Sequence, residues 1–207
     1  MPGTILIADD HPLYRQALAL AAQNVIPGAQ LVEAGTLAAA ARAAGDVPDL
    51  RLILLDLKMP GATGYSGIAL LHAERPDVPI LVVSSAEGEA VANEARAFGA
   101  VGFLRKDSDL DTIEAAIAAA NKRRPSPAAS AEPIDTVRAT VAGLTPTQLK
   151  VLLAVLDGQL NKQIAHGLGM SEATVKAHMT AIMRKLDVSN RTQAALVARS
   201  LGLDLKH

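Results

Sequence analysis

The sequence predicts an α/β domain followed by an all-α domain, and three observations lead to this fold class. Over residues 1–121, short apolar segments alternate with Ala-rich segments of helical length. This alternation predicts a (βα)5 fold, a doubly wound parallel sheet with helices on both faces. After residue 121 only helical patterns remain, enough for four helices. The formal charge also changes sign, because residues 1–121 hold 8 basic and 15 acidic residues and residues 122–207 hold 12 and 6. An acidic part and a basic part indicate different partners for the two domains.

Five strands are expected in the first domain, because continuous apolar runs are typical of parallel strands buried on both faces. They are Thr4–Asp9, Gln30–Gly35, Arg51–Asp56, Pro79–Ser85 and Val101–Lys106, with the weakest pattern in Gln30–Gly35. The helices between and after them are expected at residues 12–25, 36–45, 66–75, 88–98 and 109–122. In sheets of this kind, ligands bind at the carboxyl ends of the strands.

A proline-rich segment divides the chain into three parts: a domain over 1–122, a linker over 123–141 and a domain over 142–207. Three prolines occur within Arg123–Pro133. Because proline lacks a backbone donor and disfavours helix at the residue before it, we expect a semi-extended tether.

The last domain is expected to contain four helices: Pro146–Asp157 behind an N-cap at Thr145, Asn161–Gly167 with Asn161 as a possible cap, Glu172–Leu186 capped by Ser171, and Thr192–Leu201. Gly169 lies in the turn before the third helix. A short helix, a glycine-containing turn and a longer basic helix are typical of a helix-turn-helix.

Composition excludes several classes of protein. Cysteine is absent, which excludes disulfides, zinc ribbons and thiol catalysis. No apolar run approaches the roughly 20 residues that span a bilayer, and the N-terminus lacks the pattern of a signal peptide. The expectation is a cytoplasmic protein without a membrane partner. The four aromatic residues are too few for a large aromatic pocket.

Three carboxylates fall at the ends of predicted strands. Asp9 and Asp10 end the first strand and Asp56 ends the third. Neighbouring strand ends would crowd these charges, and Mg²⁺, which prefers carboxylate and water oxygens, would relieve the conflict. The backbone carbonyl of Lys58 is a candidate fourth oxygen. With the metal bound, Asp56 is placed to attack a phosphoryl donor and form an aspartyl phosphate.

Two more polar residues end the remaining strands of the predicted sheet. Ser84 ends the fourth strand and can donate a hydrogen bond to phosphoryl oxygens. Lys106 ends the fifth strand and offers an ammonium group to a phosphoryl oxygen. Each residue alone is weak support for a site, but their occurrence at successive strand ends predicts one shared site.

The third helix of the last domain has two distinct faces. Val175, Met179, Ile182 and Leu186 recur at helical spacing and form an apolar stripe. Lys176, Ala177 and Thr180 lie beside or opposite that stripe, so they can enter the major groove of DNA. Basic residues in or beside the helix-turn-helix supply attraction to phosphates: Lys162, Lys176, Arg184, Lys185 and Arg191.

At this point the chain resembles the response regulators of two-component signalling, of the NarL/FixJ type. The resemblance covers residues 4–121 as a receiver domain and 143–203 as a LuxR-type helix-turn-helix. In the first domain it rests on IADDHPLYR, LLDLKMPG, VVSS and GFLRKD. In the second it rests on GLTPTQLKVL, NKQIAHGLGMSEATVKAHMTAIMRKL and NRTQAAL.

The resemblance implies a role for each residue of the acidic site. It implies that Asp9, Asp10 and Asp56 hold Mg²⁺, that Asp56 accepts phosphate from a sensor histidine kinase, and that Ser84 and Lys106 bind the phosphoryl group. Phe103 matches an aromatic position that turns inward when the serine is drawn to the phosphate.

For the second domain the resemblance implies binding to double-stranded DNA. Lys176 matches a DNA-contacting position, Ala177 and Thr180 lie at base-facing positions, and Thr174 meets phosphate at the helix start. Lys185 and Arg191 are expected to position the DNA backbone. The last helix is expected to mediate homodimer formation after phosphorylation.

Two positions depart from the usual pattern. Lys58 is a basic residue beside the phosphoacceptor, and one hypothesis is that its ammonium alters the lifetime of the phosphoryl bond. Lys150 stands where many relatives carry glutamate. The lysine is expected to lose a local ion pair or cap, worth roughly a few tenths of a kcal/mol on an exposed face.

Two other function classes stay open on the sequence. One is a Mg²⁺-dependent phosphohydrolase with an aspartyl-phosphate intermediate, although such enzymes usually carry a second carboxylate where this chain has Lys58. The other is a DNA-binding protein with a degenerate receiver, which the complete acidic set disfavours. The expected protein is thus a regulator rather than an enzyme, with slow self-dephosphorylation at most.

Overall fold

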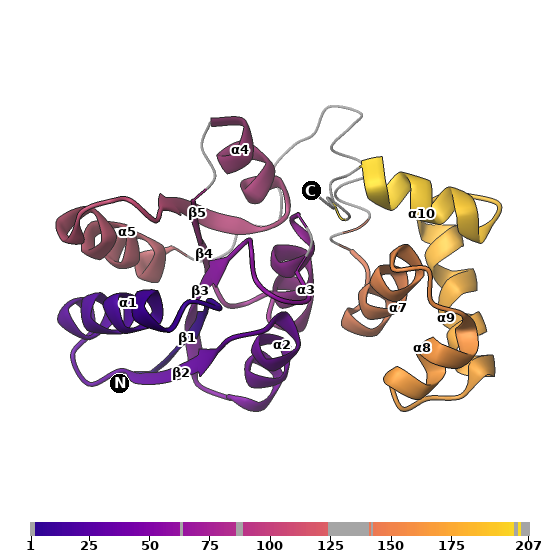
Figure 1. The fold of residues 1–207 in the computed structure, drawn as a ribbon, viewed down its shortest axis with the longest axis horizontal. Coiled ribbons are helices and arrows are strands. Elements are labelled where there is room, and N and C mark those ends of the chain that lie inside the picture. The colour runs from indigo at the N-terminus through magenta and orange to yellow at the C-terminus, as the bar shows by residue number, and fades with distance from the viewer. Residues whose placement is uncertain are drawn as a thin grey trace.

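The computed structural model describes residues 3–62, 64–85, 89–123, 141, 143–200 and 203. Figure 1 shows an α/β domain beside a smaller helical domain. Of the predicted linker, only Arg123 and Val141 are among these residues, so the expected tether lies outside the described part. No helix in the described ranges is both long and apolar enough to cross a membrane.

A five-stranded parallel sheet forms the centre of the N-terminal domain, as the sequence predicts. Its strands lie in the order β2-β1-β3-β4-β5. Their bounds are β1 Thr4–Ala8, β2 Gln30–Ala34, β3 Leu50–Asp56, β4 Ile80–Ser84 and β5 Ala100–Arg105. The apolar segment of β1 is fully buried, whereas β2 at the sheet edge is mostly half-buried or exposed. This edge position explains the weak apolar pattern of β2 in the sequence.

Helices cover both faces of the sheet (Figure 1). One face carries α1 (Pro12–Val25) and α5 (Leu110–Lys122), which enclose one apolar cluster with β1, β3 and β4. The other carries α2 (Leu37–Asp46), α3 (Ser66–Glu74) and α4 (Glu89–Ala97), which enclose a second. The doubly wound arrangement is therefore confirmed. The predicted helix starts at 36 and 109 are N-caps, because the side chains of Thr36 and Asp109 each accept a hydrogen bond from the helix backbone.

The C-terminal domain contains α7 (Pro146–Leu156), α8 (Asn161–Gly167), α9 (Glu172–Lys185) and α10 (Arg191–Ser200). The expected caps at Thr145 and Ser171 both form, and the Gln148 side chain completes a capping box with Thr145. The expected cap at Asn161 is wrong, because Asn161 is the first helical residue of α8 and Leu160 precedes it. The Gln163 side chain accepts the Leu160 N–H instead, at 2.7 Å.

The two domains meet through α3 and α7 (Figure 1). Lys150 on α7 places Nζ 2.6 Å from Oε1 of Glu74 on α3. One cluster of buried apolar side chains extends from the α2 and α3 side of the sheet into the core of the C-terminal domain. A cleft of about 710 Å³ lies beside this contact, between α2 and the α7–α8 region. The helix α9 packs on α7 and α8 and contributes no residue to the lining of this cleft.

Candidate functional site

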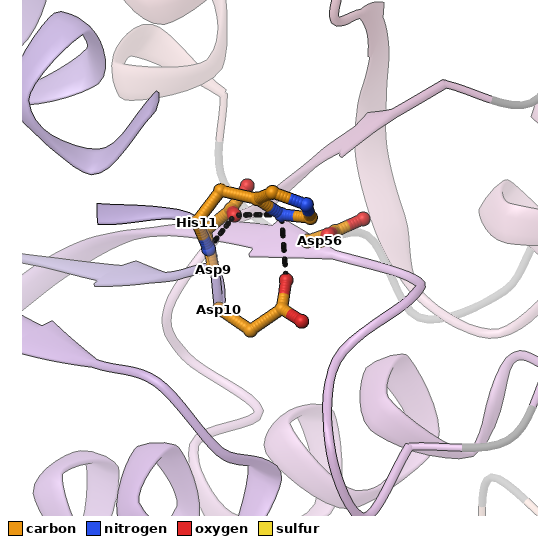
Figure 2. Close-up of side chains that lie close together, drawn as sticks. All are labelled: Asp9, Asp10, His11 and Asp56. Carbon is orange, nitrogen blue, oxygen red and sulfur yellow. Dashed lines mark hydrogen bonds and ion pairs between the residues drawn. The ribbon is translucent and has the colours of Figure 1, made fainter. Parts of the chain in front are cut away.

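The strand order brings the predicted carboxylates together at one edge of the sheet. β1 and β3 are neighbours, and Ala8 pairs with Leu55, so Asp9 and Asp56 end their strands at the same level. Figure 2 shows Asp9, Asp10 and Asp56 around a common point with His11. One ligand atom from each of these four residues lies within 4.8 Å of all the others. Asp9 and Asp56 are buried, whereas Asp10 is exposed.

Lys106 supplies the positive charge of this edge. Its Nζ lies 2.6 Å from Asp9 Oδ2 and 2.8 Å from Asp56 Oδ2. Asp56 Oδ1 accepts the backbone N–H of Lys58 at 3.0 Å. Burial nevertheless raises the pKa of the Asp56 carboxyl, against the opposing hydrogen bonds from Lys106 and Lys58. Burial also disfavours the charged form of Lys106, but its hydrogen bond to Asp56 and its ion pair with Asp9 outweigh this and raise its pKa.

His11 belongs to the same group, and the sequence reasoning missed it. Its backbone N–H donates to Asp9 Oδ1 at 2.8 Å, and its ring Nδ1 lies 2.7 Å from Asp10 Oδ1 (Figure 2). The signal was available, because a histidine directly after two carboxylates at a strand end must lie at the same edge. Since its ring is largely exposed, it can turn away when a metal ion takes the carboxylates.

The donor set of this edge fits a hard divalent cation. Asp9 Oδ2 is buried and makes no aligned hydrogen bond within the described ranges, although Lys106 Nζ lies close to it. Three carboxylates offer the oxygen ligands that Mg²⁺ prefers. A buried carboxylate oxygen without an aligned donor is a position where a metal ion improves the electrostatics.

Ser84 and Lys106 lie next to one another at the ends of β4 and β5. Ser84 is fully buried, and its carbonyl accepts the Lys106 N–H at 2.9 Å. Since β3 and β4 are also neighbours, the strand order places Asp56, Ser84 and Lys106 in sequence across the edge. Phe103 is half-buried on β5 and borders a small cavity of about 190 Å³ between β5 and α5.

The C-terminal domain presents the predicted DNA face to solvent. Val175, Met179, Ile182 and Leu186 are buried, as the apolar stripe predicts. Lys162 and the candidate contact residues of α9, namely Thr174, Lys176, Ala177 and Thr180, are exposed. The main contact between the domains is that of α3 with α7, and these residues are uncovered in this structure. A groove of about 380 Å³ follows this face, and the sequence analysis gave no DNA-facing role to three of its polar residues, Asn161, Ser189 and Asn190.

Two of the predicted DNA contacts also hold the domain together. Lys185 Nζ donates to the Gly143 carbonyl at 3.0 Å and to Gln148 Oε1 at 2.9 Å, which joins α9 to the start of α7. Arg191 donates to Asn161 Oδ1 at 2.8 Å and to the Gln159 carbonyl, which joins α10 to α8. Sequence spacing alone cannot reveal these contacts, because their partners lie about 30 to 40 residues away.

Comparison with known proteins gives matches over both domains. The profile "Response regulator receiver domain" matches residues 5–118, and "Bacterial regulatory proteins, luxR family" matches residues 142–198. A glycerol metabolism activator of Pseudomonas putida is 39% identical over 94% of each chain. The nitrate/nitrite response regulator NarP of Escherichia coli is 32% identical over 95% of this chain and 94% of its own.

Solved structures agree on the fold. RcsB from Salmonella enterica serovar Typhimurium, bound to promoter rprA with the phosphomimetic BeF3⁻, has a TM-score of 0.50. It is 21% identical and the match covers 95% of this chain and 99% of that one, a likeness that shows the fold alone. Receiver domains generally bind Mg²⁺ at an acidic site, and proteins with this domain pair work with sensor kinases and bind DNA. The chain therefore belongs to the NarL/FixJ-type response regulators, DNA-binding transcriptional regulators that respond to phosphorylation, and not to a class of conventional enzymes.

Proposed function

We propose that Asp56 is the phosphoacceptor, that Asp9, Asp10, Asp56 and the Lys58 carbonyl hold Mg²⁺, and that a sensor histidine kinase is the donor. The observation that carries this proposal is the convergence of Asp9, Asp56 and Lys106 at one sheet edge. Asp56 is buried at the base of the site, where a nucleophile is shielded from water, and Asp10 lies at its exposed rim.

The proposed transfer forms a bond between an Asp56 carboxylate oxygen and phosphorus. The bond from phosphorus to the phosphohistidine nitrogen breaks, and this nitrogen keeps the electron pair. Mg²⁺, when bound, screens the negative charges of donor and acceptor. Lys106 and the Ser84 hydroxyl then bind phosphoryl oxygens, with Lys106 leaving the carboxylates for the new anion. Phe103 turns toward the space that Ser84 vacates, which carries the change to the β5 surface.

The output step is binding of a dimer to DNA, in the cytoplasm. Lys176, Ala177 and Thr180 enter the major groove, and Lys162, Thr174, Lys185 and Arg191 contact phosphates. Lys185 and Arg191 can serve both roles, since a lysine or arginine side chain that bonds to carbonyls retains donors for a phosphate. The exposed Leu196 on α10 supports a dimer contact there. The RcsB structure, a promoter complex with a phosphomimetic, supports DNA binding in the phosphorylated state.

Phosphorylation of the purified full chain tests the acceptor. Wild type and Asp56→Asn are incubated with Mg²⁺ and acetyl phosphate, and the intact mass is followed by mass spectrometry. We expect wild type to gain one phosphoryl group only when Mg²⁺ is present, and Asp56→Asn to gain none. Equal labelling of the two proteins would rule out Asp56 as the acceptor.

Slow self-dephosphorylation is also part of the proposal, and Lys58 is the residue expected to tune it. Its side chain is exposed while its backbone N–H holds Asp56, so the ammonium can approach the phosphoryl group from outside. Decay of the purified phosphoprotein should change in Lys58→Ala. An unchanged decay rate would leave only the backbone of Lys58 with a role.

A further inference from the structure

Tyr14 lies beside the acidic site, and no role has been given to it above. It belongs to the first turn of α1, where its N–H donates to the His11 carbonyl at 3.1 Å. The Nζ atom of Lys106 lies 5.0 Å from the centroid of the Tyr14 ring. We propose that the Tyr14 ring is a positioning residue, which holds the Lys106 ammonium in place for phosphoryl transfer to Asp56. This inference rests on the function proposed above.

The local structure explains how the ring reaches the ammonium. Side chains of a helix lean toward its N-terminus. The N-terminus of α1 directly follows β1, at the edge that carries Asp9 and Asp10. The Tyr14 ring also packs against the apolar cluster between α1, α5 and the sheet. A ring fixed in this way forms a rigid wall next to Lys106.

The Tyr14 ring can hold the Lys106 ammonium when Mg²⁺ competes for the carboxylates that bind it. Lys106 is bound by Asp9 and Asp56, which are the same carboxylates that a Mg²⁺ ion would take. The aromatic face is the contact that the metal does not compete for. Attraction between a cation and a ring face depends little on direction. The ammonium can therefore turn from a carboxylate to a phosphoryl oxygen while it keeps its contact with the Tyr14 ring. Without the ring, the flexible lysine side chain has more conformations to lose on binding the phosphoryl group.

The hydroxyl of Tyr14 is not required for this role. It is buried and has no hydrogen-bond partner within the part of the chain that the structure describes. A buried hydroxyl without a partner does not stabilise the fold, so its removal should be tolerated. The ring face and the hydroxyl can therefore be separated by substitution, which makes the proposal testable.

The test compares Tyr14→Leu with Tyr14→Phe in the full chain, using Mg²⁺ and acetyl phosphate as phosphodonor. Tyr14→Leu keeps an apolar side chain and loses the ring, and it should slow phosphorylation by about 2- to 30-fold, the range that cation–π energies imply. Tyr14→Phe keeps the ring and should stay within about twofold of wild type. Leu13→Ala is the control, because this neighbour in the same helical turn is 80% exposed.

A double-mutant cycle shows whether Tyr14 acts through Lys106. In a Lys106→Met background the Tyr14→Leu effect should disappear, since no ammonium remains to be held. The proposal is wrong if Tyr14→Leu matches wild type, if Tyr14→Phe is as slow as Tyr14→Leu, or if the loss persists without Lys106. Absence of phosphorylation in wild type would instead overturn the proposed function itself, so the two failures are distinguishable.

Discussion

The edge of the sheet that carries Asp9, Asp56 and Lys106 (the acidic edge) and the surface that carries the candidate DNA contacts (the basic face) are built in opposite ways. In the N-terminal domain, Asp9, Asp56 and Lys106 are distant in sequence, but parallel strands bring them within hydrogen-bond distance. In the C-terminal domain, most of the candidate DNA contacts follow one another along α9, and all but Arg191 are exposed. The charges of the acidic edge therefore depend on each other, whereas the side chain of Lys176 on the basic face makes no contact that the structure records with another charged residue. Substitutions should reveal this difference.

The largest effect is expected at the acidic edge. Asp9→Asn removes a buried carboxylate ligand, so phosphorylation by acetyl phosphate should lose its response to Mg²⁺. Asp10→Asn changes a carboxylate that is 34% exposed, and it should weaken Mg²⁺ binding less. The rate measured across a Mg²⁺ titration distinguishes the two variants. A wild-type Mg²⁺ response in Asp9→Asn would contradict the proposed metal site.

Two lysines on α9 are expected to differ in their effect on stability. Lys185→Ala breaks two hydrogen bonds to the start of α7 and should lower the free energy of unfolding by about 1 kcal/mol. The expected effect is small for two hydrogen bonds because Lys185 is exposed and solvent weakens them. Lys176→Ala breaks no bond of its side chain that the structure records and should change stability by less than about 0.5 kcal/mol. Denaturant unfolding provides the measurement.

DNA binding should separate the same two variants in a second way. On mixed-sequence duplex DNA, Lys185→Ala should reduce the slope of log affinity against log salt by about 1, because Lys185 is a proposed phosphate contact. Lys176→Ala, at a proposed base contact, should change this slope less. If Lys176→Ala destabilised the domain more than Lys185→Ala, the division between surface and structural lysines would be wrong.

Sequence patterns predicted which polar residues lie at the acidic edge, because the carboxyl ends of parallel strands share one edge of the sheet. Asp9, Asp56, Ser84 and Lys106 needed only the strand order to come together. The roles of Lys185 and Arg191 in holding helices together could not be predicted, since they depend on how four helices pack. The contact between Lys150 and Glu74 depends on domain docking, which no local pattern encodes.

His72 should make the stability of the α/β domain depend on pH. Burial lowers the pKa of His72, and its Nδ1 has no partner within the described ranges. A lowered pKa in the folded state means that the neutral ring contributes stability above the ordinary value of 6.5, and that this is lost as the pH falls. Wild type should lose more unfolding free energy between pH 7.5 and 5.5 than His72→Gln. Equal losses would show that protonation of His72 is not responsible.

The smallest effect is expected at the contact between domains. The Glu74–Lys150 pair is partly exposed, and such pairs contribute at most about 1 kcal/mol. Lys150→Glu places two like charges together and should favour separated domains, which small-angle scattering detects as a larger radius of gyration. Adding Glu74→Lys to that variant should restore the compact form, and failure to do so would assign docking to apolar contacts alone.

In the proposed function, phosphorylation of Asp56 controls the exposed DNA face from a distance. Genome-wide DNA footprinting of wild type beside Asp56→Ala, under conditions that activate the kinase, tests it most directly. We predict that sites occupied by wild type lose most of their protection in the variant, whose basic face is unchanged. Equal occupancy by both proteins would contradict phosphorylation control and leave only the DNA-binding role.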